Sequence, residues 1–113
     1  MAQDKSESKK KIGILGGTFN PAHKGHIKIS KEAKKKYNLN KVIWAITKNN
    51  PFKYYKASNL KDRIKYAKKI NTKNKFIEIK FYENIIKSNR TIDLLKYLKQ
   101  KNKNAEIYFI MGA

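Results

Sequence analysis

The sequence predicts an α/β fold in which helices flank a parallel β-sheet, and two observations lead to this prediction. First, four short apolar runs alternate with longer segments of helical periodicity. Second, strands and helices are expected to follow one another strictly in turn, which is typical of a parallel sheet with right-handed crossovers. The chain has 113 residues, enough for one domain with a sizeable core. We expect that domain at residues 11–113, after a basic flexible tail at residues 1–10.

The four apolar runs predict the strands. They are rich in β-branched and aromatic residues, and three of them are uninterrupted by charge, as in strands buried on both faces of a parallel sheet. The third run instead alternates between apolar and charged residues. The predicted strands are residues 12–15, 42–46, 76–81 and 107–111.

Three helices are predicted between the strands. The first spans residues 23–37 and has a lysine-rich outer face. Ser58 is the predicted N-cap of the second helix. The third spans residues 91–101, with Asp93 in its favourable first turn. The predicted inner stripes are Ile27, Ala33 and Tyr37 in the first helix, Leu60, Ile64, Ala67 and Ile70 in the second, and Ile92, Leu95 and Leu98 in the third.

The chain is strongly basic, with a formal net charge of +20. Such a charge would attract nucleic acid, acidic membranes or phosphorylated small molecules. Nearly all of it is lysine, however, with only Arg63 and Arg90 as arginines, and the chain is also rich in Asn, Ile and Tyr. Codons rich in A and T encode these residues, whereas readers of phosphates and bases favour arginine. The composition therefore favours base-composition drift, and nucleic acid is not an expected partner.

Several classes of site and location are excluded by residue type. The chain has no cysteine, which excludes disulfides, thiolate zinc sites and cysteine nucleophiles, and which is compatible with a reducing cytosol. No apolar run approaches the roughly 20 residues that span a bilayer. The N-terminal residues also lack the apolar region of a secretory signal. We therefore expect a cytoplasmic protein that makes no membrane contact.

The loop after the first strand is where chemistry is expected, because ligands of parallel sheets bind beyond the carboxyl ends of the strands. Gly16 and Gly17 carry no side chains, so their backbone N–H groups can approach an anion closely. Thr18 adds a hydroxyl donor, and the Phe-Asn-Pro sequence that follows makes a turn. The loop is thus suited to hold a phosphate group.

Two histidines open the helix that follows. His23 and His26 are three residues apart, so they lie on nearly the same face, beside the free N–H groups and positive dipole end that bind phosphate. Gly25 removes a side chain where a nucleotide would need room. This pattern suits a polyphosphate laid across the helix N-terminus.

Other interpretations of the loop remain open. The two histidines could bind a metal, although no third ligand of the usual kind is nearby. The loop matches neither the P-loop pattern nor the G-x-G-x-x-G pattern. A purely structural glycine-rich turn is the simplest alternative, but it would not explain why both histidines of the chain fall in this segment.

The segment GGTFNPAHKGH resembles the signature of the nucleotidyltransferase superfamily, roughly G-x-F-[DN]-P-x-H-x-G-H. The paired glycines are similar to those of nicotinate-nucleotide adenylyltransferases. Further segments resemble this family in the same order, although Lys48 stands where proline is expected and Arg90 where tyrosine is usual. These segments are TKNNPFK, LKDRIKYAKK, NRTIDLL and IYFIMGA.

The resemblance implies a Rossmann-like parallel sheet with flanking helices, truncated after its fourth strand. It also implies transfer of AMP from ATP, accompanied by Mg²⁺, to nicotinate mononucleotide, giving deamido-NAD and pyrophosphate. His23 and His26 would be the catalytic residues, with no protein ligand to a metal. The implied ATP-binding residues are Gly16, Gly17, Thr18, Phe19, His23, Gly25, His26 and Gly112, and the implied substrate-binding residues are Thr18, Asn20, Lys53 and Thr91.

The family's second signature, I-S-x-T-x-[IV]-R, has no match in the chain. We therefore expect weak nucleotide binding with little or no turnover, and self-association through the unpaired edge of the last strand. Three alternatives are retained: a sister nucleotidyltransferase with a phosphopantetheine or cytidylyl acceptor, an inactive remnant, and a basic nucleic-acid-binding module.

Overall fold

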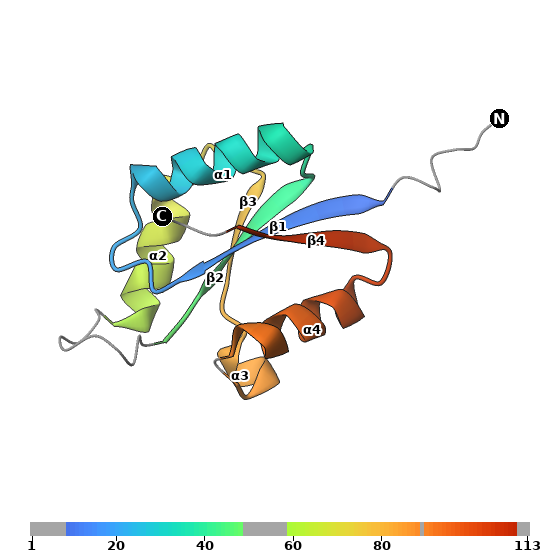
Figure 1. Ribbon diagram of the computed structural model, residues 1–113. Helices are drawn as coiled ribbons and strands as arrows, with labels where there is room; N and C mark the ends of the chain where they lie inside the picture. Colours follow the sequence, from blue (N-terminus) through green and yellow to red (C-terminus); the bar gives the residue numbers. More distant parts are fainter. Residues whose placement is uncertain (1–8, 49–58, 89, 111–113) are drawn as a thin grey trace.

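The computed structural model describes residues 9–48, 59–88 and 90–110 and confirms the α/β prediction. Its centre is a four-stranded sheet, all parallel, in the order β3-β2-β1-β4 (Figure 1). Gly17 pairs with Ile46 at the end of β2, so the two central strands finish side by side. The strands are β1 (Lys10–Gly17), β2 (Lys41–Ile46), β3 (Ile77–Lys80) and β4 (Ala105–Ile110).

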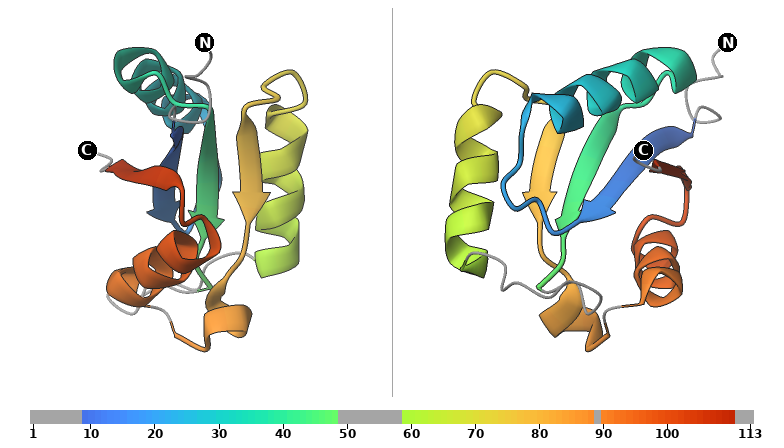
Figure 2. Two further views of the ribbon diagram at one scale, coloured as in Figure 1. Left: turned by 90° about the vertical axis from the view of Figure 1, so that its right-hand side faces the viewer. Right: turned by 60° about the vertical axis from the view of Figure 1, so that its left-hand side comes forward.

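Helices cover both faces of the sheet. Helices α1 (Lys24–Tyr37) and α2 (Leu60–Ile70) lie on one face, and α3 (Glu83–Ile86) and α4 (Thr91–Lys101) lie on the other (Figure 2). This arrangement buries the two central strands on both sides, as their uninterrupted apolar runs predict. In the part of the chain that is described, no helix is long and apolar enough to cross a membrane.

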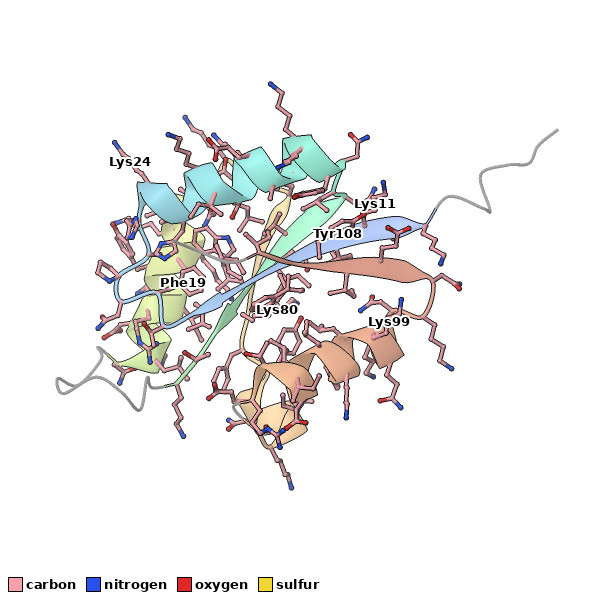
Figure 3. All side chains as sticks on the ribbon, viewed as in Figure 1. Lys11, Phe19, Lys24, Lys80, Lys99 and Tyr108 are labelled. Carbon is pink, nitrogen blue, oxygen red and sulfur yellow. The ribbon has the colours of Figure 1, made fainter. Side chains whose placement is uncertain are left out.

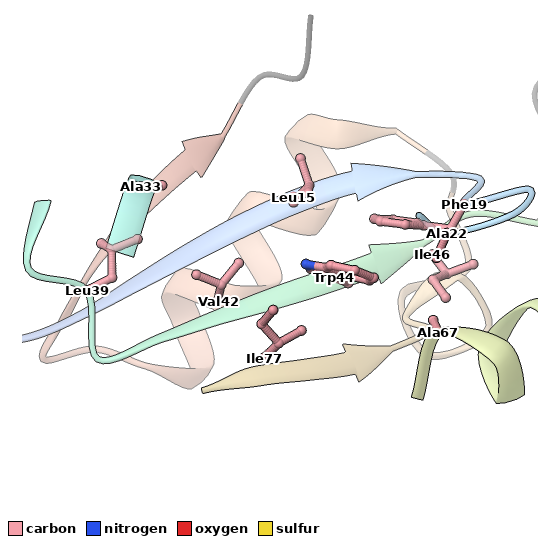
Figure 4. Close-up of a cluster of buried hydrophobic side chains, with 10 residues drawn as sticks. All are labelled: Leu15, Phe19, Ala22, Ala33, Leu39, Val42, Trp44, Ile46, Ala67 and Ile77. Carbon is pink, nitrogen blue, oxygen red and sulfur yellow. The ribbon is translucent and has the colours of Figure 1, made fainter. Parts of the chain in front are cut away.

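Alternate residues of the strands build two separate cores. The larger lies beneath α1 and α2 and centres on Trp44, which is fully buried among aliphatic side chains and the ring of Phe19 (Figure 4). The indole Nε1 donates to Ser30 Oγ at 2.8 Å, and Ser30 Oγ donates in turn to the carbonyl of His26 at 2.8 Å. The buried polar groups are thereby satisfied, and the core is tied to the first turns of α1.

The inner stripe of α2 is confirmed, whereas those of α1 and α4 need correction. Tyr37 is 43% exposed, and its ring packs at a tilt against that of Tyr108, with ring centroids 5.3 Å apart. Ile92 is 46% exposed, and the residues of α4 that pack on the sheet are Leu94, Tyr97 and Leu98. Helix α4, predicted at residues 91–101, is therefore rotated about its axis relative to the prediction. The reason is that Tyr97 of α4 packs against Tyr82, which lies just before α3.

The remaining differences concern boundaries. Strand β1 begins at Lys10, which we placed in the tail, and it includes Gly16 and Gly17. The predicted third strand is shorter, and its last residues lead into the short helix α3, which the sequence pattern did not predict. The N-cap of α2 is Asn59, whose side chain accepts from the Lys61 N–H at 2.7 Å, while Ser58 lies outside the described residues.

Candidate functional site

The turn between β1 and α1 is built around a buried aromatic ring. Phe19 has a φ of 51°, and the Asn20–Pro21 peptide bond is cis. The Phe19 ring is 2% exposed and stacks on Trp44 at 4.8 Å between ring centroids. In Figure 3 it lies between the turn and the sheet, below the start of α1. Phe19 could therefore reach a ligand only through its backbone, and its ring instead anchors the turn to the core.

The two histidines cap the first turn of α1. Nδ1 of His23 accepts the N–H of Gly25 at 3.0 Å, and Nδ1 of His26 accepts the N–H of His23 at 3.0 Å. This is a capping box in which imidazoles replace the usual hydroxyl and carboxyl groups. His23 is thus the N-cap of α1 and not its first helical residue. Because each Nδ1 is an acceptor, the proton of a neutral ring is on Nε2, which leaves two N–H donors for a ligand.

The histidine cap gives Gly25 a structural reason for its place, beside the predicted room for a nucleotide, which stays a prediction. A Cβ atom at this position would lie 2.8 Å from Cε1 and 2.9 Å from Nδ1 of His23. Since a real Cβ is essentially never found so close, a side chain at residue 25 would displace the His23 ring. Gly25 therefore preserves the capping geometry.

The environment of His26 favours its neutral form. Burial lowers the pKa of His26 below its usual value of 6.5, and the nearby His23 lowers it further. The His26 ring lies 4.5 Å from the ring of Phe19 and 4.1 Å from that of His23, between centroids. At neutral pH His26 consequently acts as an uncharged hydrogen-bond donor. Positive charge comes from the dipole of α1 and from Lys24, which projects outward at the start of that helix (Figure 3).

A cavity of about 250 Å³ lies at the carboxyl end of the sheet, on the side of α3 and α4. Gly16 and Gly17 line it together with Thr91, so the structure brings these three predicted residues to one place. The histidines lie on the α1 side, so the candidate site has two parts that flank the end of β1. The other lining residues are Ala45, Ile46, Thr47, Tyr82, Glu83, Ile86, Ser88, Arg90, Leu94 and Phe109.

Other predicted residues are placed less directly. The carbonyl of Thr18 is bound by a protein side chain, as described next, and Asn20 lies in the same turn at intermediate exposure. Lys53 and Gly112 lie outside the described residues. Within residues 9–48, 59–88 and 90–110, no group of three or more His, Asp or Glu side chains could hold a metal ion.

Two further residues hold the backbone between the two parts of the site. One of them, Arg63, belongs to the segment LKDRIKYAKK, which resembles the family's helix with an acidic residue followed by arginine, whereas the sequence analysis did not indicate the other, Glu83. Arg63, 4% exposed, donates to backbone carbonyls at the ends of β1 and β2. Glu83 accepts a backbone N–H from the same region. Besides that resemblance, the pattern of α2 itself indicates Arg63, because it interrupts the apolar inner side of the helix one residue before Ile64 and four before the buried Ala67.

A parallel sheet whose first strand leads through a glycine turn to the N-terminus of a helix is an arrangement that recurs in nucleotide-binding α/β proteins. The chain belongs to the cytidylyltransferase-like family, whose model matches residues 14–113.

Individual relatives make the comparison more specific. The chain is 63% identical over 108 residues to a protein of Pelagibacter ubique described as a probable nicotinate-nucleotide adenylyltransferase, covering 96% of this chain and 59% of the relative. It is 35% identical to a protein of Methylorubrum extorquens with the same description, covering 91% of this chain and 56% of the relative. The chain therefore spans little more than half the length of the relatives it matches.

A solved structure agrees with the fold. The nicotinic acid mononucleotide adenylyltransferase of Plasmodium falciparum, complexed with NaAD, superposes with a TM-score of 0.71 at 23% identity. The match covers 88% of this chain and 50% of the other. At this identity the likeness shows the fold alone.

Proposed function

We propose that the chain carries the nucleotide-binding part of a nicotinate-nucleotide adenylyltransferase, which transfers AMP from ATP to nicotinate mononucleotide. A phosphate oxygen of the mononucleotide would attack the α-phosphorus of ATP, and the bond from that phosphorus to the bridging oxygen of the β-phosphate would break. The products would be deamido-NAD and pyrophosphate. No protein nucleophile is needed, which suits a site without cysteine.

The observation that carries this proposal is the histidine capping box. Both Nδ1 atoms are held by backbone N–H groups, so both Nε2–H groups are available at the N-terminus of α1. Donors fixed in this way can stabilise charge on phosphate oxygens without reorganising during the reaction. His23 and His26 would therefore bind the ATP phosphates and stabilise the departing pyrophosphate. Gly16, Gly17, Thr18, Phe19 and Gly25 would hold the nucleotide through backbone and hydroxyl contacts, together with Gly112.

The lining of the cavity suits a phosphorylated acceptor with a flat aromatic ring that carries a carboxylate. Its wall combines the cation of Arg90 and the hydroxyl of Thr91 with the apolar side chains of Leu94 and Phe109. We propose that the mononucleotide occupies this cavity near Thr91, with Thr18, Asn20 and Lys53 as further contacts. ATP on the α1 side and the acceptor in the cavity would then meet over Gly17.

Mg²⁺ would enter with ATP. It usually keeps several waters and is held through phosphate oxygens with few protein ligands. Bound in this way, the ion would neutralise negative charge on the triphosphate.

The chain's turnover is a separate proposal, because the relatives are longer than the region they share with it. We propose weak ATP binding by this chain with little or no turnover, in the cytoplasm. Titration of the chain with ATP and Mg²⁺, followed by the ¹H–¹⁵N NMR signals of both imidazoles, tests the binding. Imidazole signals that do not move at millimolar ATP would contradict it. CTP is titrated in parallel at the same concentration as the rival nucleotide, because the family that the chain matches is cytidylyltransferase-like.

The acceptor is tested separately by pyrophosphate release. A chain extended to the length of the relatives is given ATP with nicotinate mononucleotide, its amide counterpart or phosphopantetheine. The proposal expects release with nicotinate mononucleotide. Release only with another acceptor would assign the chain to a sister transferase.

Self-association is proposed from the sheet edge. In the described part of the chain β4 pairs only with β1, and Phe109 on β4 is 39% exposed. An unpaired strand edge is a template for pairing with a second copy. Sedimentation velocity over a hundredfold range of concentration should show a dimer, and a monomer throughout would contradict this part of the proposal.

A further inference from the structure

A buried guanidinium joins the ends of the two central strands. Nη1 of Arg63 donates to the carbonyls of Thr18 and Thr47, each at 2.7 Å, and Nη2 donates to the carbonyl of Lys48 at 2.6 Å. Thr18 follows β1, whereas Thr47 and Lys48 follow β2. One side chain of α2 therefore binds the exits of both strands.

The same backbone is held from the opposite face of the sheet. Oε1 of Glu83, at the start of α3, accepts the N–H of Lys48 at 3.2 Å. The N–H of Lys48 is thus bound from α3 and its carbonyl from α2, and these two helices lie on opposite faces (Figure 2). Burial lowers the pKa of Arg63, and the charge of Glu83 acts against that shift. The guanidinium remains protonated, because its usual pKa is far above neutral.

The position of these bonds is what connects them with the site. The regular hydrogen bonding between β1 and β2 ends at the bond from the Thr47 N–H to the Gly17 carbonyl, at 2.8 Å. Beyond it the chain continues from β1 into the turn that leads to the histidines, and from β2 to Lys48. Gly17 and Thr47 also line the cavity, as does Glu83. The bonds of Arg63 and Glu83 consequently fix the backbone between the two parts of the site.

We propose that Arg63 and Glu83 are positioning residues, which hold the exits of β1 and β2 so that the histidines of α1 and the cavity keep their spacing. Neither residue needs to touch the nucleotide. For its ligand this inference rests on the proposed ATP binding. For its geometry it depends only on the hydrogen bonds just described.

Lysine cannot replace Arg63 in this role. A guanidinium presents five N–H donors in a rigid plane, whereas an ammonium is a compact point charge on a flexible stem. Arg63→Lys keeps the positive charge but cannot bind three carbonyls from two nitrogen atoms in the same plane. For Glu83 a matched pair is available, because Glu83→Gln keeps an oxygen that can accept the Lys48 N–H and Glu83→Ala does not.

The first experiment needs no ligand. Amide hydrogen exchange of Thr47 and Lys48 is measured by NMR in the wild-type chain and in the Arg63→Lys, Glu83→Gln and Glu83→Ala variants. We expect exchange at these amides to be about tenfold faster in Arg63→Lys and Glu83→Ala and unchanged in Glu83→Gln. Wild-type rates in both Arg63→Lys and Glu83→Ala would overturn the proposal. If Arg63→Lys does not fold, the Glu83 pair still decides this point.

The second experiment separates positioning from stability. Ala67→Gly, in the same helix and fully buried, weakens α2 without removing any of the Arg63 bonds. At a temperature where both variants are fully folded, ATP affinity should fall about tenfold in Arg63→Lys and stay near wild type in Ala67→Gly. Equal affinities in the two variants would show that Arg63 is structural only. Failure of the wild-type chain to bind ATP would instead contradict the proposed function, and the exchange measurements would still decide whether Arg63 and Glu83 position the strand exits.

Discussion

His23 and His26 hold each other in place: the N–H of His23 donates to Nδ1 of His26, while Nδ1 of His23 accepts from Gly25 and the two rings lie 4.1 Å apart. The same two side chains thus cap the N-terminus of α1 and are the proposed phosphate ligands. This dual use makes the stabilising role and the ligand-binding role separable by substitution.

The first prediction concerns His23. Asparagine is a good N-cap and can accept the Gly25 N–H, so we expect His23→Asn to leave the free energy of unfolding nearly unchanged. His23→Ala should lower it by about 1 kcal/mol, because the cap is lost. Both variants remove the Nε2 donor and should weaken ATP binding about tenfold, as for a hydrogen bond to a charged group worth about 1.5 kcal/mol.

Urea denaturation followed by circular dichroism and an ATP titration measure the two effects separately. His23→Asn is its own control for folding. If it binds ATP like the wild type, the His23 ring has no role beyond the cap.

The second prediction concerns pH. Burial lowers the pKa of His26 below its usual value of 6.5. The unfolded chain therefore takes up a proton at this residue before the folded chain does, and stability that is complete above pH 6.5 is lost as the pH falls through the lowered pKa. The melting temperature should thus decrease on acidification. His26→Gln, which keeps an acceptor for the His23 N–H, should reduce that decrease.

Phosphate acts in the opposite direction. Negative charge beside His26 favours the protonated ring, so ATP should raise the pKa of His26. ATP affinity is accordingly expected to increase as the pH is lowered from 8 to 6, and less so in His26→Gln. Titration of the imidazole signals with and without ATP checks this directly, and an unchanged His26 pKa would contradict phosphate binding at this ring.

The third prediction is that Gly25→Ala destabilises the chain, although glycine-to-alanine substitutions inside helices usually stabilise. Replacing a glycine inside a helix by alanine normally stabilises it by up to about 1 kcal/mol. Here the new Cβ would lie 2.8 Å from Cε1 of His23, so we expect Gly25→Ala to destabilise the chain by about 1 kcal/mol through loss of the cap.

In the His23→Ala background the conflict is absent, and Gly25→Ala should become stabilising. A double-mutant cycle by urea denaturation measures this coupling. Additive free energies would mean that the His23 ring does not depend on the glycine.

The fold could be predicted because its signals are local. Uninterrupted apolar runs mark β1 and β2 as central strands, and the apolar spacing of α2 is confirmed by its packing. Helix α3 has four residues and no buried side chain, so it leaves no periodic pattern to detect. The orientation of α4 depends on the contact of Tyr97 with Tyr82, which lies in another element and which periodicity does not reveal.

The candidate site also has one part that the sequence reveals and one part that it does not. The histidines and glycines are close together in sequence, and their geometry is mostly set by hydrogen bonds between residues two or three positions apart. Arg63 binds backbone carbonyls 45, 16 and 15 residues away, and Glu83 accepts a backbone N–H 35 residues away. Which carbonyl a side chain reaches is decided by the packing of α2 and α3 on the sheet. Such partners cannot be derived from spacing along the chain.

The fourth prediction concerns the hydrogen bond between Trp44 and Ser30 in the larger core. Both side chains are fully buried, and the indole Nε1 donates to Ser30 Oγ at 2.8 Å. Ser30→Ala would leave the indole N–H without this acceptor, at a cost of about 1–3 kcal/mol. Trp44→Phe removes the N–H but also leaves a cavity, so a similar loss is expected.

In the double variant no indole N–H remains to be satisfied. The double variant should therefore lose about 1 kcal/mol less unfolding free energy than the two single variants lose together. Because Trp44 is the single tryptophan of the chain, unfolding is followed by circular dichroism in all four proteins. Ser30 also donates to the carbonyl of His26, so its loss should shift the His26 imidazole signals even where the fold persists. Unshifted signals in Ser30→Ala would show that the core and the histidine pair are independent, and strictly additive stabilities would show that the indole N–H finds another acceptor.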